Sequence, residues 1–556
     1  MRRSLLPWLL LGGVLLWNVP EIRAESDFEA DAETTDSARQ RPLPPDLQPG
    51  AQIVTEGRPL SIAEAVALSI RNNLDVEVER YAPLISEANR DGAWGAYDPT
   101  LSADAAYDVV KTPSTSSFNL DVQQTRDRFQ GGGVGVEQLI PYLGATLNLR
   151  FEGASNRTRN PFQNLNPRYD SSFFISARIP LARNLIWNEP WTNVKISKIA
   201  YGRSRDEFKT SLMDNVQLTV DNYWNLVAAR DQVRVAQKSL ETARALLDQT
   251  KTQYEVGVVS RVEVVEAEAG VADREFELIR TANVFRNSQD QVIDTVLGRE
   301  LAAMTSFQFV PTEDPESYEL RQVDVELAVR QAFRERPELK IEDRQIEQGE
   351  VQLKFAKNQR LPQLDLEMRY GFVGVGGDGQ ATPNLDPSTP PPVPPGNSSF
   401  SDSTRDYFTG DGADNYRIQA IFSIPFPNTA ARKRVVVSEL ELRRARTRRL
   451  RLEQTIILEV RGAARLLSAS AQGIDAAERR RLAAEEQLRA EKIRLEHGES
   501  TPFEVLQRES DLVEAESQKI GALQTYRSAE IGLERAQGTI LDFHGVVVDE
   551  ARKFRR

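Results

Sequence analysis

The sequence predicts an α+β fold made of two tandem copies of one unit, each with a short β region and a long helical hairpin. Three observations indicate this. The stretch YEVGVVSRVEVVEAE, which begins at Tyr254, returns as LEHGESTPFEVLQRE, which begins at Leu495. Both stretches interrupt long runs in which apolar residues recur at steps of three and four, as in helices packed side by side. Two further segments alternate strictly between apolar and polar residues, as two-faced strands do.

The internal repeat covers almost the whole chain. A shift of 241 residues places Gly257 on Gly498 at the two turns. A shift of 263 residues places Ala65 on Ala328 near the start of each copy. Self-similarity of this length indicates a tandem duplication. The predicted boundaries are residues 60–310 for the first repeat, residues 311–322 for a linker and residues 323–545 for the second repeat.

The two ends of the chain have the composition of segments outside the folded unit. Arg2 and Arg3 precede an apolar stretch that is too short to span a bilayer as a helix, so we expect residues 1–24 to be a secretory signal peptide. Residues 25–59 are acidic and rich in proline, which predicts a disordered lead-in. We expect residues 546–556 to form a C-terminal tail.

The β regions, at about residues 100–179 and 363–424, each have two distinct faces. The apolar sets are Leu101, Ala103, Ala105, Tyr107 and Val109 in the first region and Leu364, Leu366, Met368, Tyr370 and Phe372 in the second. Return strands with the same period surround Ile175 and Ile418, so we expect four strands of about ten residues. That length suits strands that cross an outer membrane at a tilt, although a soluble sandwich would alternate in the same way. Residues 131–155 either extend these strands or form a separate hairpin.

The long helical runs carry a heptad pattern. The seam positions are Leu226, Ala229, Val233, Ala236, Leu240, Ala243, Leu247, Thr250 and Tyr254 in one run and Ile456, Val460, Ala463, Leu467, Ser470, Ile474 and Ala477 in the other. The run from about Arg205 to Val256 predicts a rod of roughly 75 to 80 Å. Rods of this length cannot bury one another in a single globule. We therefore expect coiled-coil hairpins with two tips at one end, at residues 254–263 and 495–504.

The composition excludes several classes of function. The chain has no cysteine and only two histidines, which argues against thiolate metal sites and Cys or His nucleophiles. The net charge of −12 argues against a nucleic-acid partner. The acidic stretch TGDGADN, which begins at Thr409, lacks the ligand spacing of a calcium-binding EF-hand loop. We therefore expect no catalytic site, no metal site and no cofactor.

Together these features resemble the TolC-like outer-membrane efflux proteins. The resemblance rests on the signal peptide, the duplicated α-β-α halves, the opening LSIAEAVALSIRNN and the two turns, and it extends from about Leu60 to Leu541. It implies an α+β membrane protein that forms a trimer in the outer membrane of a diderm bacterium. Four strands from each chain would close one twelve-stranded β-barrel, which the helices would continue as a periplasmic α-barrel. The implied activity is that of a passive exit duct for efflux or type I secretion.

The resemblance also implies partners and site residues. The tips would dock to a periplasmic membrane-fusion adaptor, which connects the duct to an inner-membrane pump of the RND or ABC type, and the barrel would contact outer-membrane lipid. The implied docking residues are Gly257, Val258, Ser260, Arg261, Gly498, Thr501 and Pro502. The implied periplasmic gate comprises Glu263, Glu266, Glu504 and Gln507. A structural alternative for these carboxylates is simple stabilisation by the dipole of the helix that they begin.

Two other classes of function share part of the pattern. A periplasmic coiled-coil adaptor or scaffold without its own membrane barrel would have the heptads, but it has no use for four two-faced strands. A secreted enzyme with paired carboxylates, such as a glycosidase, would need a compact fold that rods of roughly 75 Å do not provide. We therefore expect an exit duct and not an enzyme.

Overall fold

The computed structural model describes residues 57–113, 124–159, 163–298, 308–381, 399–409 and 413–546. These residues belong to one structural unit, which begins at Thr55. The predicted signal peptide, nearly all of the predicted lead-in and nearly all of the predicted C-terminal tail lie outside the described residues.

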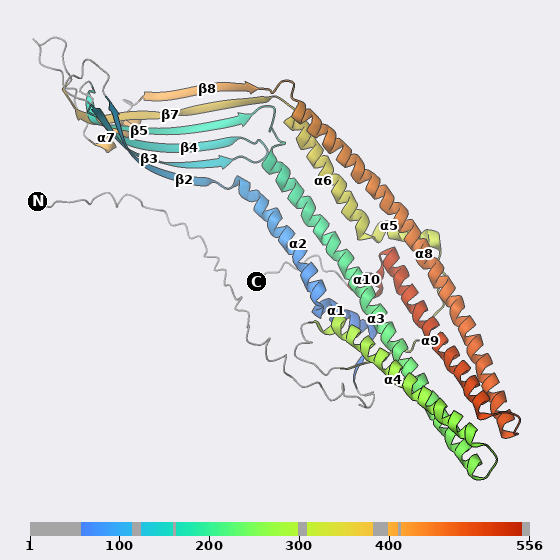
Figure 1. Cartoon of the computed structure of the whole chain (residues 1–556). Coiled ribbons are helices and arrows are strands. Elements are labelled where there is room, and N and C mark those ends of the chain that lie inside the picture. Colours follow the sequence, from blue (N-terminus) through green and yellow to red (C-terminus); the bar gives the residue numbers. More distant parts are fainter. Residues whose placement is uncertain are drawn as a thin grey trace, which may run out of the picture. The chain divides into compact units, whose positions relative to one another are not determined.

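The two repeats share one order of elements, apart from η3 and the hairpin β3-β4 in the first and the short helices α7 and α10 in the second (Figure 1). The first contains β1 (Arg58–Leu60), α1 (Ile62–Asn72), α2 (Leu74–Gly92), η3 (Ala93–Tyr97), β2 (Thr100–Pro113), β3 (Gln124–Leu139), β4 (Thr146–Arg157), β5 (Leu165–Pro180), α3 (Glu189–Glu255) and α4 (Arg261–Leu297). The second contains β6 (Phe309–Pro311), α5 (Val325–Glu335), α6 (Pro337–Gln359), β7 (Gln363–Gly379), α7 (Phe400–Thr409), β8 (Ala413–Ser423), α8 (Thr429–Glu496), α9 (Pro502–Gln537) and α10 (Ile540–Phe543). Equivalent long helices have 67 and 68 residues, and their hairpin partners have 37 and 36. The predicted tandem α+β fold is therefore confirmed.

Helix α3 begins earlier than the sequence analysis places it. The heptad pattern suggests a start at about Arg205, whereas the helix begins at Glu189. Asn188 caps this end, because its side-chain oxygen accepts a hydrogen bond from the backbone N–H of Trp191 at 2.9 Å. Pro190 fits in the first turn, where its missing N–H would have no helical partner. The helix is consequently about 100 Å long at ~1.5 Å per residue.

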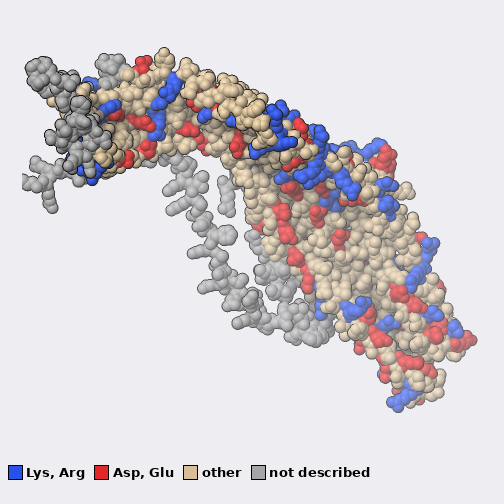
Figure 2. Space-filling model, turned by 45° about the horizontal axis from the view of Figure 1, so that its top comes forward, with Lys and Arg blue, Asp and Glu red and all other residues tan. Residues whose placement is uncertain are grey.

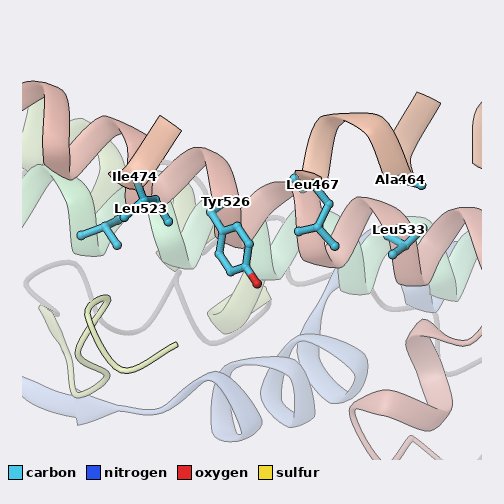
Figure 3. Packing of buried hydrophobic residues seen from close by; sticks show 7 residues of the cluster. Ala464, Leu467, Ile474, Leu523, Tyr526 and Leu533 are labelled. Carbon is cyan, nitrogen blue, oxygen red and sulfur yellow. The ribbon is translucent and has the colours of Figure 1, made fainter. Parts of the chain in front are cut away.

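The predicted seams lie in the core of the helical part. The buried seam residues are Leu226, Ala229, Val233, Ala236, Leu240, Ala243 and Thr250 in α3 and Ile456, Val460, Leu467, Ser470 and Ile474 in α8. Toward the tip of α3 the seam shifts by one position, from Leu247 to the buried Leu246, because a straight helix drifts relative to a strict heptad. Between α8 and α9, Tyr526 lies among Leu467, Ile474 and Leu523 (Figure 3).

Two buried tyrosines fix the segment between the repeats. The hydroxyl of Tyr223 on α3 donates a hydrogen bond to the backbone oxygen of Leu60 at 2.9 Å and accepts one from the N–H of Thr312 at 3.1 Å. The hydroxyl of Tyr526 on α9 donates to the backbone oxygen of Glu319 at 2.7 Å. The predicted linker is thus attached to a long helix of the first repeat and to one of the second.

In the described part of the chain, the β regions form one antiparallel sheet of six strands, in the order β2-β3-β4-β5-β7-β8. The number is six where the sequence analysis expects four, because residues 131–155, whose layout it leaves open, belong to β3 and β4. This hairpin pairs along its length with β2 on one side and with β5 on the other. It therefore widens the sheet instead of projecting from it. The first repeat contributes four strands and the second contributes two, and β5 pairs with β7 at the junction.

The sheet has an apolar face and a charged face. We define the apolar face as the one that carries Leu101, Val134, Leu149, Ile175, Leu366 and Ile418, and the charged face as the one that carries Asp104, Arg150, Arg178, Glu367 and Gln419. Much of the apolar face is open, with 76% of Leu101 and 71% of Ile418 exposed. On the charged face, Arg178 donates to Asp365 at 2.8 Å across the junction of the repeats. The predicted alternation thus produces a sheet with large apolar side chains exposed on one side.

Helix α7 lies on the apolar face at the end of the sheet away from the long helices (Figure 1). The hydroxyl of Ser171 on β5 donates to the backbone oxygen of Ser403 at 3.0 Å, and the ring of Tyr407 stacks on Phe372 with centroids 6.1 Å apart. Gly374 on β7 permits this approach, because a Cβ there would lie 1.8 Å from the oxygen of Ser403. The open part of the apolar face is therefore bounded by α7 over β5 and β7.

The surface of the helical part is strongly charged. Figure 2 shows basic residues gathered over the start of α8, near the sheet. Leu442 and Ala445 of that helix are buried, whereas Arg443, Arg444 and Arg448 are exposed, so the arginines form the outer face of an amphipathic stretch. Among the described residues, no helix combines the length and the hydropathy that a transmembrane helix needs.

Candidate functional site

The two tips are the same turn built twice. At the end of α3, the N–H of Gly257 donates to the oxygen of Tyr254 and the N–H of Val258 donates to the oxygen of Gln253, both at 2.9 Å. The corresponding bonds after α8 join Gly498 to Leu495 at 3.0 Å and Glu499 to Arg494 at 2.9 Å. This pair of bonds closes a helix with a residue in the left-handed region.

Both turns require glycine because of their backbone conformation, and not because a side chain would clash with a neighbouring atom. The φ angles of Gly257 and Gly498 are 78° and 74°, a region that side chains with a Cβ adopt only with strain. A Cβ at either position would meet nothing within 4 Å. The tips therefore present an open surface on which a partner can approach the backbone.

Polar side chains begin the helices that return from the tips. Ser260 and Glu263 form a capping box, in which the N–H and the hydroxyl of Ser260 donate to Oε1 of Glu263 at 3.4 and 3.3 Å. In the second tip the hydroxyl of Thr501 accepts from the N–H of Glu504 at 3.4 Å. Helix capping is thus sufficient to explain why a glutamate follows three residues after the hydroxyl residue in both tips.

Most of the predicted docking residues are exposed at the tips. The exposed ones are Gly257, Val258, Ser260, Arg261, Gly498 and Thr501. Pro502 is buried in the first turn of α9, so its side chain does not contribute to the exposed surface. Sequence reasoning missed three exposed apolar residues beside them, namely Val256 (71% exposed), Val262 (65%) and Phe503 (54%). The sequence feature that could have identified them is the position of large apolar residues in a sharp turn and directly after it.

The four predicted gate residues lie on the first two turns of α4 and α9. Glu266, Glu504 and Gln507 are exposed, whereas Glu263 is half-buried in the capping box. The side-chain amide of Gln507 donates to Asp511 at 3.5 Å. The described residues contain no group of three or more acidic or histidine side chains that could hold a metal ion. The three carboxylates of this set place negative charge next to the tips.

Behind the tips, the two hairpins pack closely together. Val505 and Leu506 on α9 share a core cluster with Leu246 on α3 and Leu488 on α8. Gly270 on α4 allows this approach, because a Cβ there would lie 2.8 Å from a methyl group of Leu506. The two tips are therefore held at one end of the helical part by direct contact between the repeats (Figure 1).

Glu509 is a buried carboxyl group at the junction of these hairpins. Only 3% of it is exposed, and it borders a groove of about 320 Å³ between α3, α8 and α9. Ser239 on α3 donates to its Oε1 at 3.4 Å, and its Oε2 has no hydrogen-bond partner among the described residues. Burial raises the pKa of Glu509, although Arg274 on α4 and Lys492 on α8 act in the opposite direction. Sequence analysis did not single out this residue, because nothing in a heptad shows which glutamate faces a second hairpin.

The fold matches solved outer-membrane channels. The CmeC outer membrane channel of Campylobacter jejuni is 15% identical, with a TM-score of 0.59 and 86% of each chain covered. The outer membrane protein VceC from Vibrio cholerae is 11% identical, with a TM-score of 0.59 over 86% of this chain and 96% of that one. The MtrE outer membrane channel of Neisseria gonorrhoeae, in its open state, is 14% identical, with a TM-score of 0.58 over 86% of this chain and 89% of that one. At such identities the likeness shows the fold.

A comparison of the sequence with models of protein families shows which family the chain belongs to. No curated protein matches the sequence significantly. The model of the outer membrane efflux protein family matches residues 122–296 and 328–539, which is more than half of the chain and includes every strand of the described sheet except β2, both long hairpins and both tips. The chain therefore belongs to the outer membrane efflux protein family, as its resemblance to TolC-like proteins predicts.

Proposed function

We propose that the protein is the outer-membrane exit duct of a tripartite efflux or type I secretion system, and that it works as a trimer. The observation that carries this proposal is the sheet at the end of the long helices, with its open apolar face. Exposed apolar residues of this kind are favourable in contact with lipid and unfavourable in water. A soluble adaptor or scaffold would gain nothing from such a face, and neither would a secreted enzyme.

The edges of the sheet support assembly into a ring. Every residue of β2 is exposed, and β8 is exposed at all positions but one. Each of these strands pairs on one side only within the described sheet. In lipid, unpaired backbone groups cost several kcal/mol each, so β2 of one chain is expected to pair with β8 of the next. Six strands per chain would give a trimeric barrel of eighteen strands, where the resemblance implies twelve.

The tips are the proposed contact with a periplasmic adaptor, which connects the duct to an inner-membrane pump. Gly257 and Gly498 expose backbone, and Val258, Val262 and Phe503 expose apolar surface beside it. Apolar side chains at an exposed turn favour contact with a partner helix. The duct itself is passive in this proposal, and the energy for transport comes from the pump.

The proposed periplasmic gate uses charge at the same end. Of the four predicted gate residues, Glu266 and Glu504 are the exposed carboxylates, one on each returning helix. In a trimer each would occur three times around the mouth, and like charges at one narrow opening repel unless a cation or a conformational change relieves them. Glu263 contributes less to this gate, because it is engaged as a helix cap.

Cross-linking tests the ring. The chain has no cysteine, so single cysteines can be introduced without background. Purified protein in mild detergent should be a trimer, and cysteines at Ala105 in β2 and Ala420 in β8 should be joined between chains by a short bifunctional reagent. The matched pair Ala105 and Ala177 should not be joined between chains, because β5 already has partners on both sides. A stable monomer with full β content would contradict the proposal.

A further inference from the structure

Basic residues are concentrated at the far end of the apolar face, on the three strands β2, β3 and β4. From the helix end outward, this face of β2 carries Leu101 to Val109 and then Lys111. On β3 it carries Val136 and Val134 before Arg128 and Arg126, and on β4 it carries Leu147, Leu149 and Phe151 before Arg157. All three strands thus change in the same direction from apolar to basic. We call Lys111, Arg126, Arg128 and Arg157 the basic cluster.

The sheet register places these cations directly opposite one another. Lys111 pairs with Arg126 across β2 and β3, and Arg128 pairs with Arg157 across β3 and β4. Like charges in directly opposite positions destabilise a sheet. Two such pairs on neighbouring strands therefore need an explanation other than local stability.

On the described parts of β2, β3 and β4, no acidic side chain neutralises the cluster from the same face. In the described parts of β2, β3 and β4, every Asp and Glu lies on the charged face, and these residues are Asp104, Asp108, Asp127, Glu137 and Glu152. Nε of Arg126 is buried without a hydrogen-bond partner among the described residues. By contrast, Arg150 on the charged face pairs with Asp104 at 2.8 Å. Within these three strands the positive charge of the cluster is therefore uncompensated, which favours the binding of an anion.

The cluster lies one membrane thickness from the helix end of the sheet. From Leu147 to Arg157, β4 rises about 33 Å along its own axis at ~3.3 Å per residue. A strand tilted by about 40° would then carry Arg157 about 25 Å along the membrane normal, which is the height of the apolar band of outer-membrane barrels. Helix α7 lies on the same face over neighbouring strands at this end (Figure 1). The cluster is thus at the level where lipid headgroups begin.

We infer that the basic cluster binds the phosphorylated headgroup of an outer-leaflet lipid, with the acyl chains of that lipid against the adjoining apolar face. Arginine is suited to this ligand, because its planar guanidinium donates two parallel hydrogen bonds to phosphate oxygens. A bound phosphate also removes the repulsion within both cross-strand pairs. The inference rests on the proposed placement of the sheet in the outer membrane, with the long helices on the periplasmic side.

Lipid titration of the purified full-length protein tests the site. Native mass spectrometry in detergent should show that bis-phosphorylated lipid A binds at least about tenfold more tightly than the same lipid A after removal of its phosphates. The double variant Arg128→Gln, Arg157→Gln should lose this preference. Without lipid, the variant should unfold at the same temperature as the parent or at a higher one, because a repulsive pair has been removed.

A matched control removes one positive charge from the same end of the sheet but from the other face. Arg168 on β5 is ion-paired with Asp170 at 2.7 Å, and Arg168→Gln should keep the preference for phosphorylated lipid. An equal loss in this control, or an unchanged preference in the double variant, would overturn the site. Inorganic phosphate should bind far more weakly than lipid A. If the two bound comparably, the cluster would be a site for free anions and the proposed lipid site would be wrong.

Two further results separate this inference from the proposed function. If the protein is recovered as a trimer in the outer membrane but shows no preference for phosphorylated lipid, the lipid site is wrong and the proposed function stands. A protein that is neither trimeric nor in the outer membrane would remove both.

Discussion

Arg535 on α9 donates a hydrogen bond to Oε1 of Glu338 on α6 at 2.9 Å, and Arg336 donates a second to the same oxygen, also at 2.9 Å. Arg535 contacts Asp214 on α3 as well, at 2.7 Å. The contact therefore joins the last long helix of the second repeat to a short helix of that repeat and to the first repeat. Burial opposes the charge on Glu338, but the hydrogen bond from Arg336 and the charges of both arginines lower its pKa to about 2.

This contact predicts loss of stability in acid. The pKa of Glu338 is lower in the folded protein than its ordinary value of 4.5, so its contribution to stability is complete above about pH 4.5 and is lost as the pH falls toward 2. Glu338→Gln should lower the free energy of unfolding by about 2 to 3 kcal/mol at pH 7, and the difference should vanish near pH 2. Thermal unfolding followed by circular dichroism between pH 7 and pH 2 measures both trends. Glu326→Gln, at an exposed ion pair with Arg330, should change little at any pH.

Glu509 should behave in the opposite way. Burial raises the pKa of Glu509 above its usual value of 4.5. The carboxyl group therefore costs no stability below pH 4.5. The cost grows as the pH rises above 4.5 and is complete once the group is ionised in the folded protein. Glu509→Gln should therefore stabilise the protein near neutral pH, by an amount on the order of 1 kcal/mol, with the gain disappearing in acid. Thermal unfolding at several pH values provides the comparison. The exposed Glu514, which is paired with Arg480, supplies the control Glu514→Gln. A loss of stability in the Glu509 variant at neutral pH would mean that its charge is satisfied by Arg274 or Lys492.

Adjacent residues of β8 test the assignment of the two faces. Ile418 lies on the apolar face, whereas Gln419 lies on the charged face opposite Glu367. Ile418→Arg should reduce the yield of assembled trimer, because an arginine facing lipid near the bilayer midplane costs roughly 2 to 4 kcal/mol. Gln419→Arg should be tolerated, since the new charge faces a carboxylate. Trimer yield in the outer-membrane fraction is the measurement, and equal yields for the two variants would show that the faces are assigned wrongly.

The glycines of the tips should separate assembly from transport. Gly257→Val and Gly498→Val place a β-branched residue at φ angles of 78° and 74°, which costs about 1 to 2 kcal/mol at one site and leaves the sheet untouched. We expect normal trimer yield but loss of efflux, measured as dye accumulation in cells that depend on this duct. Cross-linking from cysteines at Ser260 and Thr501 to the candidate adaptor should be lost in parallel.

A second substitution distinguishes the shape of the turn from its surface. Asparagine tolerates the left-handed region, so Gly257→Asn should retain most of the efflux activity. Phe503→Ser, which keeps the backbone and removes exposed apolar area, should weaken adaptor cross-linking while the trimer stays intact. Normal efflux in all tip variants would mean that the turns serve only to reverse the chain.

Local patterns in the sequence were sufficient for the parts of the fold that depend on short-range periodicity. The seam residues around Leu226 and Ile456, the two-faced strands and both tip glycines could all be predicted, since each follows from spacing along one segment. The start of α3 was missed, because the Asn188 cap lies outside the clear heptads. The place of β3 and β4 in the sheet also could not be deduced, because alternation does not specify which strand is the neighbour.

The candidate sites show the same limit. The tips are contiguous in sequence, so their residues could be named. Lys111, Arg126 and Arg157 come from three strands, and only the register brings them together. The buried position of Glu509 likewise depends on how α9 crosses the other hairpin. Long-range pairing is the information that a single sequence lacks.

Among the described residues, the hairpin β3-β4 has no equivalent in the second repeat, and this difference between the repeats has an evolutionary consequence. A hairpin adds two antiparallel strands and leaves every later strand running in its former direction, so it can be gained or lost while the helices on either side keep their contacts. In a threefold ring each such event changes the wall by six strands, and the diameter of a barrel grows roughly in proportion to strand number. Descendants of one duplicated ancestor could thus acquire outer-membrane pores of different calibre while sharing the same periplasmic machinery.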